Sequence, residues 1–314
     1  METEVAKFLT EYDLTGLDKS FVGLHGKMGA VLFFFLYARQ VNEAKFIIQA
    51  ENLIDEVVES NCLSIESDFY NDITGIGWAF EYLNQHQFIQ IDTDEILSEI
   101  DNGLLGAKLQ RNAIHLNKTV FDYGIYFLMR SRNFTTLPLL KRRYLSFLVE
   151  EIEFMLFHQN YHRNEIPKLN HHLINSLFFF LIESYKLNIN AFHAKKVLLS
   201  LSKYFNVTLS NSSMKLSDSL ITLQLIKDAR FLTENDVHLK KPYQVLYHIV
   251  ETGIKDLLIK DEDMPRLAWN SLMYNIDLSN DLFSPYLTPV KMRNDMEIAD
   301  KVSTGIILLL KNKS

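Results

Sequence analysis

Cysteine is almost absent from this chain of 314 residues, because Cys62 is the only one. A single cysteine cannot form an intrachain disulfide, which excludes the disulfide framework of small secreted domains. It also excludes a zinc site built from several thiolates, since at most one ligand could be sulfur.

Long apolar runs and an N-terminal targeting pattern are also lacking. The longest apolar runs, such as AVLFFFLYA and SLFFFLI, are well short of the roughly 20 residues that a membrane span requires. The N-terminal sequence METEVAKFLTEYDL has acidic residues where a signal peptide has basic ones followed by an apolar stretch. We therefore expect a soluble, cytoplasmic protein without a membrane span.

An excess of basic charge is missing too. The net charge is −7, with 32 Lys and Arg against 39 Asp and Glu. Binding to nucleic acid depends on clustered cations, so nucleic acid is not an expected partner. The one basic cluster, Lys141, Arg142 and Arg143, is expected on a solvated helix face.

Turn-forming residues are few, with six prolines and eleven glycines. All-β sandwiches and barrels usually contain more of them, which favours an all-α fold. The apolar spacing agrees, since Leu53, Ile54, Val57 and Val58 follow the pattern of one helical face. No linker rich in Gly, Ser or Pro divides the chain, so we predict a single domain over residues 1–314.

The sequence does contain a repeat. In each copy a cluster of small or polar residues stands at the start of an apolar segment that we expect to be helical. Successive copies begin roughly 40–50 residues apart, and another amphipathic helix is expected in each interval. A period of this size is typical of stacked helical hairpins. The seven copies cover residues 20–39, 69–85, 120–132, 168–185, 214–230, 264–276 and 301–313.

The two kinds of helix in this repeat differ in polarity. The helices that begin with these clusters are apolar nearly all round, which predicts that they form an inner layer. The helices between them carry charge on one face, which predicts that they form an outer layer. The last repeat ends on the apolar ILLL instead of a polar cap, so a closed α/α toroid of about seven hairpins fits better than an open solenoid. Phe33 to Phe35 and Phe178 to Phe180 are expected in the core of the inner helices.

Seven of the eleven glycines fall in the helix-opening phrases, although glycine is about 1 kcal/mol worse than alanine inside a helix. We expect them to allow close approach of the backbone where the helix ends converge. They are Gly23, Gly26, Gly29, Gly75, Gly77, Gly124 and Gly305.

These phrases resemble those of the lanthionine synthetase C-like (LanC-like) family. GLHGKMGAVLFFFLYAR is similar to the first repeat of that family, ITGIGWAFEYL to the second and FDYGIYFLMR to the third. The resemblance implies an α/α toroid and a role in the modification of ribosomal peptides. Family members with complete motifs are cyclases, in which zinc held by two cysteines and a histidine activates a peptide thiol that adds to a dehydrated Ser or Thr.

The chain departs from the family pattern at the zinc ligands. The fifth repeat of the family supplies a Trp-Cys pair where this chain has SDSLITLQL, and the sixth supplies Cys-His-Gly where it has RLAWNSLMY. Cys62 lies before the second repeat, on a different element. We therefore expect no zinc cofactor, and a protein that binds a peptide or a partner enzyme in its central cavity.

Three residues are candidates for a functional site. The resemblance implies that His172 takes the place of an acid/base histidine of the fourth repeat, although the flanking glycines are Leu173 and Ser176 here. Asp72 takes a helix-start position where acids recur in the family, and its favoured alternative role is to cap that helix. His25 opens the first inner helix and either faces the cavity or makes a structural hydrogen bond.

Other interpretations stay open. His158 and His162 are four residues apart and, with His171 or His172 and Glu165, could form a substitute metal site of nitrogen and oxygen ligands. An active enzyme with zinc-free chemistry around His172 is a second possible function. A glycan-processing toroid is a third, disfavoured because such sites usually expose tryptophan and the chain has only Trp78 and Trp269.

Overall fold

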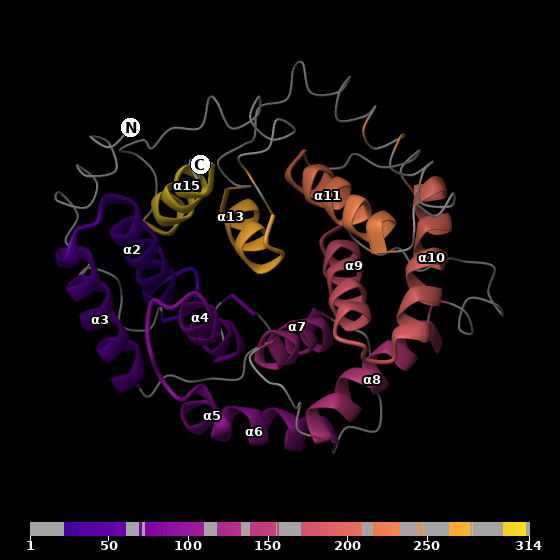
Figure 1. Ribbon diagram of the computed structural model, residues 1–314, viewed down its shortest axis with the longest axis horizontal. Helices are drawn as coiled ribbons and strands as arrows, with labels where there is room; N and C mark the ends of the chain where they lie inside the picture. The colour runs from indigo at the N-terminus through magenta and orange to yellow at the C-terminus, as the bar shows by residue number, and fades with distance from the viewer. Residues whose placement is uncertain are drawn as a thin grey trace. The chain divides into compact units, whose positions relative to one another are not determined.

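The computed structural model describes residues 22–60, 69–70, 73–109, 118–132, 139–154, 156, 171–208, 216–232, 244, 247, 264–276, 278 and 298–311. Within these residues every regular element is a helix, which confirms the predicted all-α fold (Figure 1). The chain divides into a first unit, Met1–Thr93 with Leu258–Ser314, and a second unit, Asp94–Leu257. The single domain expected over residues 1–314 stays a prediction.

The first unit combines helices from both ends of the chain. Helix α2 packs against α3, α4 and α15, and α13 packs against α15, so the last described helix lies against the first one. The helices of this unit are α2 (Lys27–Val41), α3 (Ala44–Glu59), α4 (Ile73–Gln85), α13 (Met264–Met273) and α15 (Ile298–Lys311).

The second unit is centred on α9, which packs against α7, α8, α10 and α11. It begins within the short α5 (Thr93–Ile96). Its other helices are α6 (Ser98–Leu109), α7 (Lys118–Arg132), α8 (Leu139–Phe154), α9 (His171–Lys186), α10 (Ala191–Thr208) and α11 (Leu216–Leu232).

The helices differ in burial as the repeat predicts. In α2 every residue from Lys27 to Ala38 is buried, whereas its neighbour α3 buries a single stripe. That stripe, with the spacing of one helical face, is Phe46, Ala50, Leu53 and Val57. The sequence pattern places Val58 on the same apolar face as Val57, and this prediction is wrong. Val58 is 63% exposed because it lies about 100° round the helix from Val57.

The same contrast holds in the second unit, where residues 174–184 of α9 are all buried and α8 and α10 bury one face each. Phe33 to Phe35 and Phe178 to Phe180 belong to the core, as predicted, and both tryptophans are buried. None of the helices in the described ranges is both long and apolar enough to cross a membrane.

Two glycines of the repeat have the same structural role. A Cβ on Gly29 would lie 2.0 Å from the carbonyl oxygen of Leu24, and a Cβ on Gly75 would lie 2.1 Å from that of Phe69. No real side chain tolerates such a contact with backbone. The loop that enters each helix therefore folds over its first turn, which only glycine allows.

Asparagine, and not glycine, has the left-handed backbone conformation at helix ends in the described residues. Among the described residues the only non-glycine residues with positive φ are Gln87 and four asparagines, and no glycine has a positive φ. Asparagine tolerates the left-handed conformation that commonly ends a helix. Asn42 has it at the C-cap of α2, and Asn188 and Asn190 have it in the turn between α9 and α10.

Candidate binding site

His25 and Tyr70 join the two glycine-containing helix starts of the first unit. The ring of His25, before α2, stacks on the ring of Tyr70, before α4, with centroids 4.9 Å apart and an interplanar angle of 8°. The backbone N–H groups of Leu24 and His25 donate to the carbonyl oxygen of Tyr70, at 2.6 and 3.4 Å. His25 is half-buried and Tyr70 is buried, so the stack leads from the surface into the core.

Tyr70 continues this path to α13. Its hydroxyl donates to the amide oxygen of Asn270 at 3.1 Å, and Asn270 is fully buried. The neighbouring Trp269 lies against α2, where its ring is 3.0 Å from the position of a Cβ on Gly29. We call His25, Tyr70, Trp269 and Asn270 the polar cluster of the first unit.

Several buried polar atoms next to this path have no hydrogen-bond partner among the described residues. On α13 they are Trp269 Nε1, Asn270 Nδ2 and Ser271 Oγ, and on α15 Thr304 Oγ1. An unsatisfied buried donor or acceptor costs about 1–3 kcal/mol, so native structures contain few of them. Tyr144 Oη and Ser184 Oγ of the second unit are also without a partner in the described part of the chain, so the first unit is distinguished by four such atoms on two adjacent helices.

The donor set does not fit zinc. An indole N–H and an amide NH₂ only donate hydrogen bonds, whereas zinc binds thiolate, imidazole or carboxylate ligands. In the described part of the chain no group of three or more His, Cys, Asp and Glu residues is placed to hold a metal ion. The unpartnered N–H groups of Trp269 and Asn270 instead suit an acceptor oxygen, such as that of a carbonyl, a carboxylate or a water molecule.

The structure places one of the three predicted site residues within this cluster, namely His25. Asp72 lies outside the described residues. His172 is the second residue of α9, in the second unit, and its side chain is outside the described part, so its acid/base role stays a prediction. The possible metal ligands His158, His162 and Glu165 also lie outside it.

Helix α9 carries a polar contact one turn after His172. Asn175 donates to the backbone oxygen of Asp218 on α11 at 3.3 Å and accepts from the hydroxyl of Thr222 at 2.5 Å. Thr222 also contacts the backbone oxygen of Asp218 at 2.7 Å. Both side chains are buried, so this pair joins α9 to α11 by hydrogen bonds within the core.

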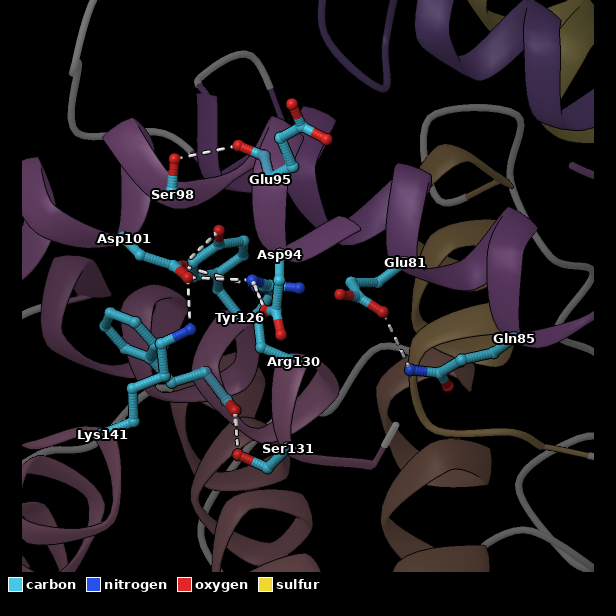
Figure 2. A network of polar contacts seen from close by, with 11 residues as sticks. Glu81, Gln85, Asp94, Glu95, Ser98, Asp101, Tyr126, Arg130, Ser131 and Lys141 are labelled. Carbon is cyan, nitrogen blue, oxygen red and sulfur yellow. Dashed lines mark hydrogen bonds and ion pairs between the residues drawn. The ribbon is translucent and has the colours of Figure 1, made fainter. Parts of the chain in front are cut away.

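A larger polar network lies in the second unit around Asp101 of α6 (Figure 2). Its carboxylate accepts from the hydroxyl of Tyr126 at 2.7 Å, from Arg130 Nη2 at 2.9 Å and from Lys141 Nζ. Arg130 also donates to Asp94 on α5 at 2.7 Å. The negative charges of Asp94 and Asp101 balance the positive charges of Arg130 and Lys141. The network joins α5, α6, α7 and α8.

This network corrects the expectation that Lys141 lies on a solvated face. Arg142 and Arg143 are exposed as predicted, but Lys141 is buried because Asp101 of another helix supplies a buried counter-charge. Arg130 has no exposed surface. A ligand therefore cannot reach its guanidinium, and the network is structural.

Two acidic residues, Glu183 on α9 and Asp228 on α11, have displaced pKa values. Burial raises the pKa of Glu183, but Arg132 and Lys186, at 2.6 and 2.8 Å, outweigh burial and hold that pKa below its ordinary value. Burial raises the pKa of Asp228 on α11. Because Glu183 is held by two cations, we interpret this pair as structural.

Sequence reasoning missed Tyr70 and Asn270. Both had a weak signal, since Tyr70 stands two residues before the candidate Asp72 and Asn270 interrupts an otherwise apolar helix in LAWNSLM. Comparison of the chain with protein-family models, with curated proteins and with solved structures finds no match.

Proposed function

We propose that this chain is a LanC-like protein of ribosomal peptide modification that binds a peptide, or a partner enzyme, without zinc-dependent cyclase activity. In this proposal, the helices that the seven repeats open form the inner layer of an α/α toroid, and the ligand binds in its central cavity. The order of these helices and the glycine-containing starts of α2 and α4 support the proposal.

The observation that carries the proposal is the set of unpartnered donors on α13. This helix corresponds to the repeat that supplies zinc ligands in the family, and here it has the N–H groups of Trp269 and Asn270. Peptide backbones present carbonyl acceptors that match such donors. The residues at this position therefore suit hydrogen bonding to a peptide better than activation of a thiol by a metal.

Access to these donors involves His25. The unpartnered atoms are buried, and His25 is the partly exposed end of the cluster. In this proposal the His25–Tyr70 stack moves when a peptide enters, which lets a peptide carbonyl reach Asn270.

Selection from a displayed library of random peptides tests the proposal. We expect enriched peptides to bind the purified protein in calorimetry with the same Kd with and without a chelator. Trp269→Phe, which keeps the ring and removes the N–H, should weaken binding about tenfold. Trp78→Phe is the matched control and should leave the Kd unchanged.

Two results would contradict the proposal. One is the absence of any enriched peptide. The other is peptide binding that is unchanged in both Trp269→Phe and Asn270→Leu while their melting temperatures stay at the wild-type value.

A further inference from the structure

Helix α8 of the second unit has an exposed apolar stripe. Leu140, Phe147 and Phe154 are 61%, 39% and 50% exposed. They are seven residues apart, and seven residues are nearly two helical turns, so the three side chains lie on one face with a drift of about 20° per step. Large exposed apolar side chains in such an arrangement are a sign of an interaction surface.

The stripe is distinct from the face that α8 uses inside its unit. That face buries Leu145, Leu148 and Ile152 against neighbouring helices. Phe192, which is 77% exposed, stands at the start of α10 near the C-terminal end of the stripe, since the next residue, His193, contacts Glu153.

Charges along the stripe divide into two halves. Arg143 precedes Phe147 by four residues, and Glu150 and Glu151 follow it by three and four. Neither Arg143 nor Glu151 forms a hydrogen bond or ion pair with any residue that the structure describes. The stripe is therefore basic before its central phenylalanine and acidic after it, with two of its charges unpaired within the described part of the chain.

We propose that α8 binds α8 of a second copy of this chain in antiparallel orientation about Phe147. In this arrangement Phe147 packs against Phe147 of the second copy, and Leu140 packs against Phe154 of the second copy. Arg143 then lies within about one residue of Glu150 and Glu151 of the second copy, and two-fold symmetry repeats each contact. The charge pattern is complementary to itself only when the helices are antiparallel.

The size of the surface sets the strength of the dimer. A helix of sixteen residues is about 24 Å long, and one face of it buries much less than the roughly 800 Å² per partner of a standard interface. We therefore expect a Kd in the micromolar range or weaker, and a dimer whose fraction changes with concentration.

Sedimentation velocity from about 1 to 500 µM full-length protein tests the proposal. The wild type should change from monomer to dimer across this range. Phe147→Glu places two like charges at the symmetry axis and should weaken dimerisation at least about tenfold. Val58→Glu, at an exposed apolar residue of α3, is the matched control and should not change it.

Charge reversal tests the orientation. Arg143→Glu alone, or Glu150→Arg with Glu151→Arg, should each weaken the dimer, and the triple variant should restore it. A monomeric wild type at every concentration overturns the proposal, as does a dimer that Phe147→Glu leaves unchanged. Weakening in both charge variants without rescue in the triple variant overturns the antiparallel pairing. If the wild type stays monomeric and Phe147→Glu lowers the melting temperature, the stripe is covered within the chain.

Discussion

The Asp101 network of the second unit and the polar atoms on α13 and α15 of the first unit are buried in different ways. In the second unit the buried Asp101 contacts three donors, and the buried Thr222 and Asn175 bond to each other. In the first unit Trp269 Nε1 and Thr304 Oγ1 are buried without a partner among the described residues. Networks with full pairing stabilise a unique packing, whereas unpaired buried groups cost stability.

We interpret the Asp101 network as structural and the polar cluster of the first unit as a candidate binding site. In the second unit the Asp101 network and the Asn175–Thr222 pair join helices through paired contacts, although the hydroxyls of Tyr144 and Ser184 are buried there without a partner among the described residues. The described part of the first unit has four unpartnered polar atoms within α13 and α15, a cost that selection accepts most readily at binding sites.

The largest expected effect is that of Asp101→Asn. This change leaves Arg130 and Lys141 buried beside a neutral amide, and it should lower the free energy of unfolding by about 3–5 kcal/mol. Asp94, whose side chain is 48% exposed, is the control, and Asp94→Asn should cost less than about 1 kcal/mol. Urea denaturation measures both, and equal costs would contradict the structural role of the network.

Next in size is Gly75→Ala in the first unit. The added methyl group would lie 2.1 Å from the backbone oxygen of Phe69, so the entering loop must shift, at a cost of about 3 kcal/mol. A Cβ added to Gly103 of α6 would have no atom of the described residues within 4 Å. Gly103→Ala should therefore raise stability by up to about 1 kcal/mol, because alanine is the better helix former. Stabilisation by both changes would show that the loop does not fold over α4.

A third comparison replaces one threonine in each unit by valine. Thr222→Val removes a paired hydroxyl and should lower the free energy of unfolding by about 1–2 kcal/mol. Thr304→Val removes an unpaired buried hydroxyl and should raise that free energy by about 1 kcal/mol. Thermal unfolding of both variants and of the wild type gives the sign of each change in stability. A loss of stability in Thr304→Val would mean that the Thr304 hydroxyl has a partner.

The smallest expected effect is on pH dependence through Glu183. Its pKa in the folded state is lowered, so its contribution to stability is present above the unfolded-state pKa of about 4.3 and is lost as the pH falls through the folded-state value. Glu183→Gln should make the fall in stability between about pH 6 and pH 3 less steep. The raised pKa of Asp228 acts in the opposite direction, so an unchanged slope in Glu183→Gln would assign the acid sensitivity to other carboxyls.

Much of the fold could be predicted because periodicity is local. Apolar residues on all sides of residues 27–38 and on one side of residues 44–59 distinguish a buried helix from a one-faced helix without any knowledge of the fold. The glycines at the starts of α2 and α4 could be found because they stand in short phrases that recur along the chain. The closed toroid stays a prediction, because ring closure depends on contacts that periodicity does not specify.

The candidate site was harder to predict because it depends on contacts between distant residues. Tyr70 and Asn270 are 200 residues apart, and nothing near either one shows that they meet. Lys141 was misplaced for the same reason, since its counter-charge Asp101 lies 40 residues earlier on another helix. His25 could be found because it stands within the helix-opening phrase itself.

The most direct test of peptide binding in the first unit uses the two tryptophans of the chain. Each indole N–H gives its own NMR signal in ¹⁵N-labelled protein, and the spectrum of Trp269→Phe assigns the pair. When a selected peptide is added, we predict a downfield shift of the Trp269 indole proton as its N–H gains an acceptor, with the Trp78 signal unchanged. A peptide that binds and leaves the Trp269 signal in place would contradict the role of the polar cluster.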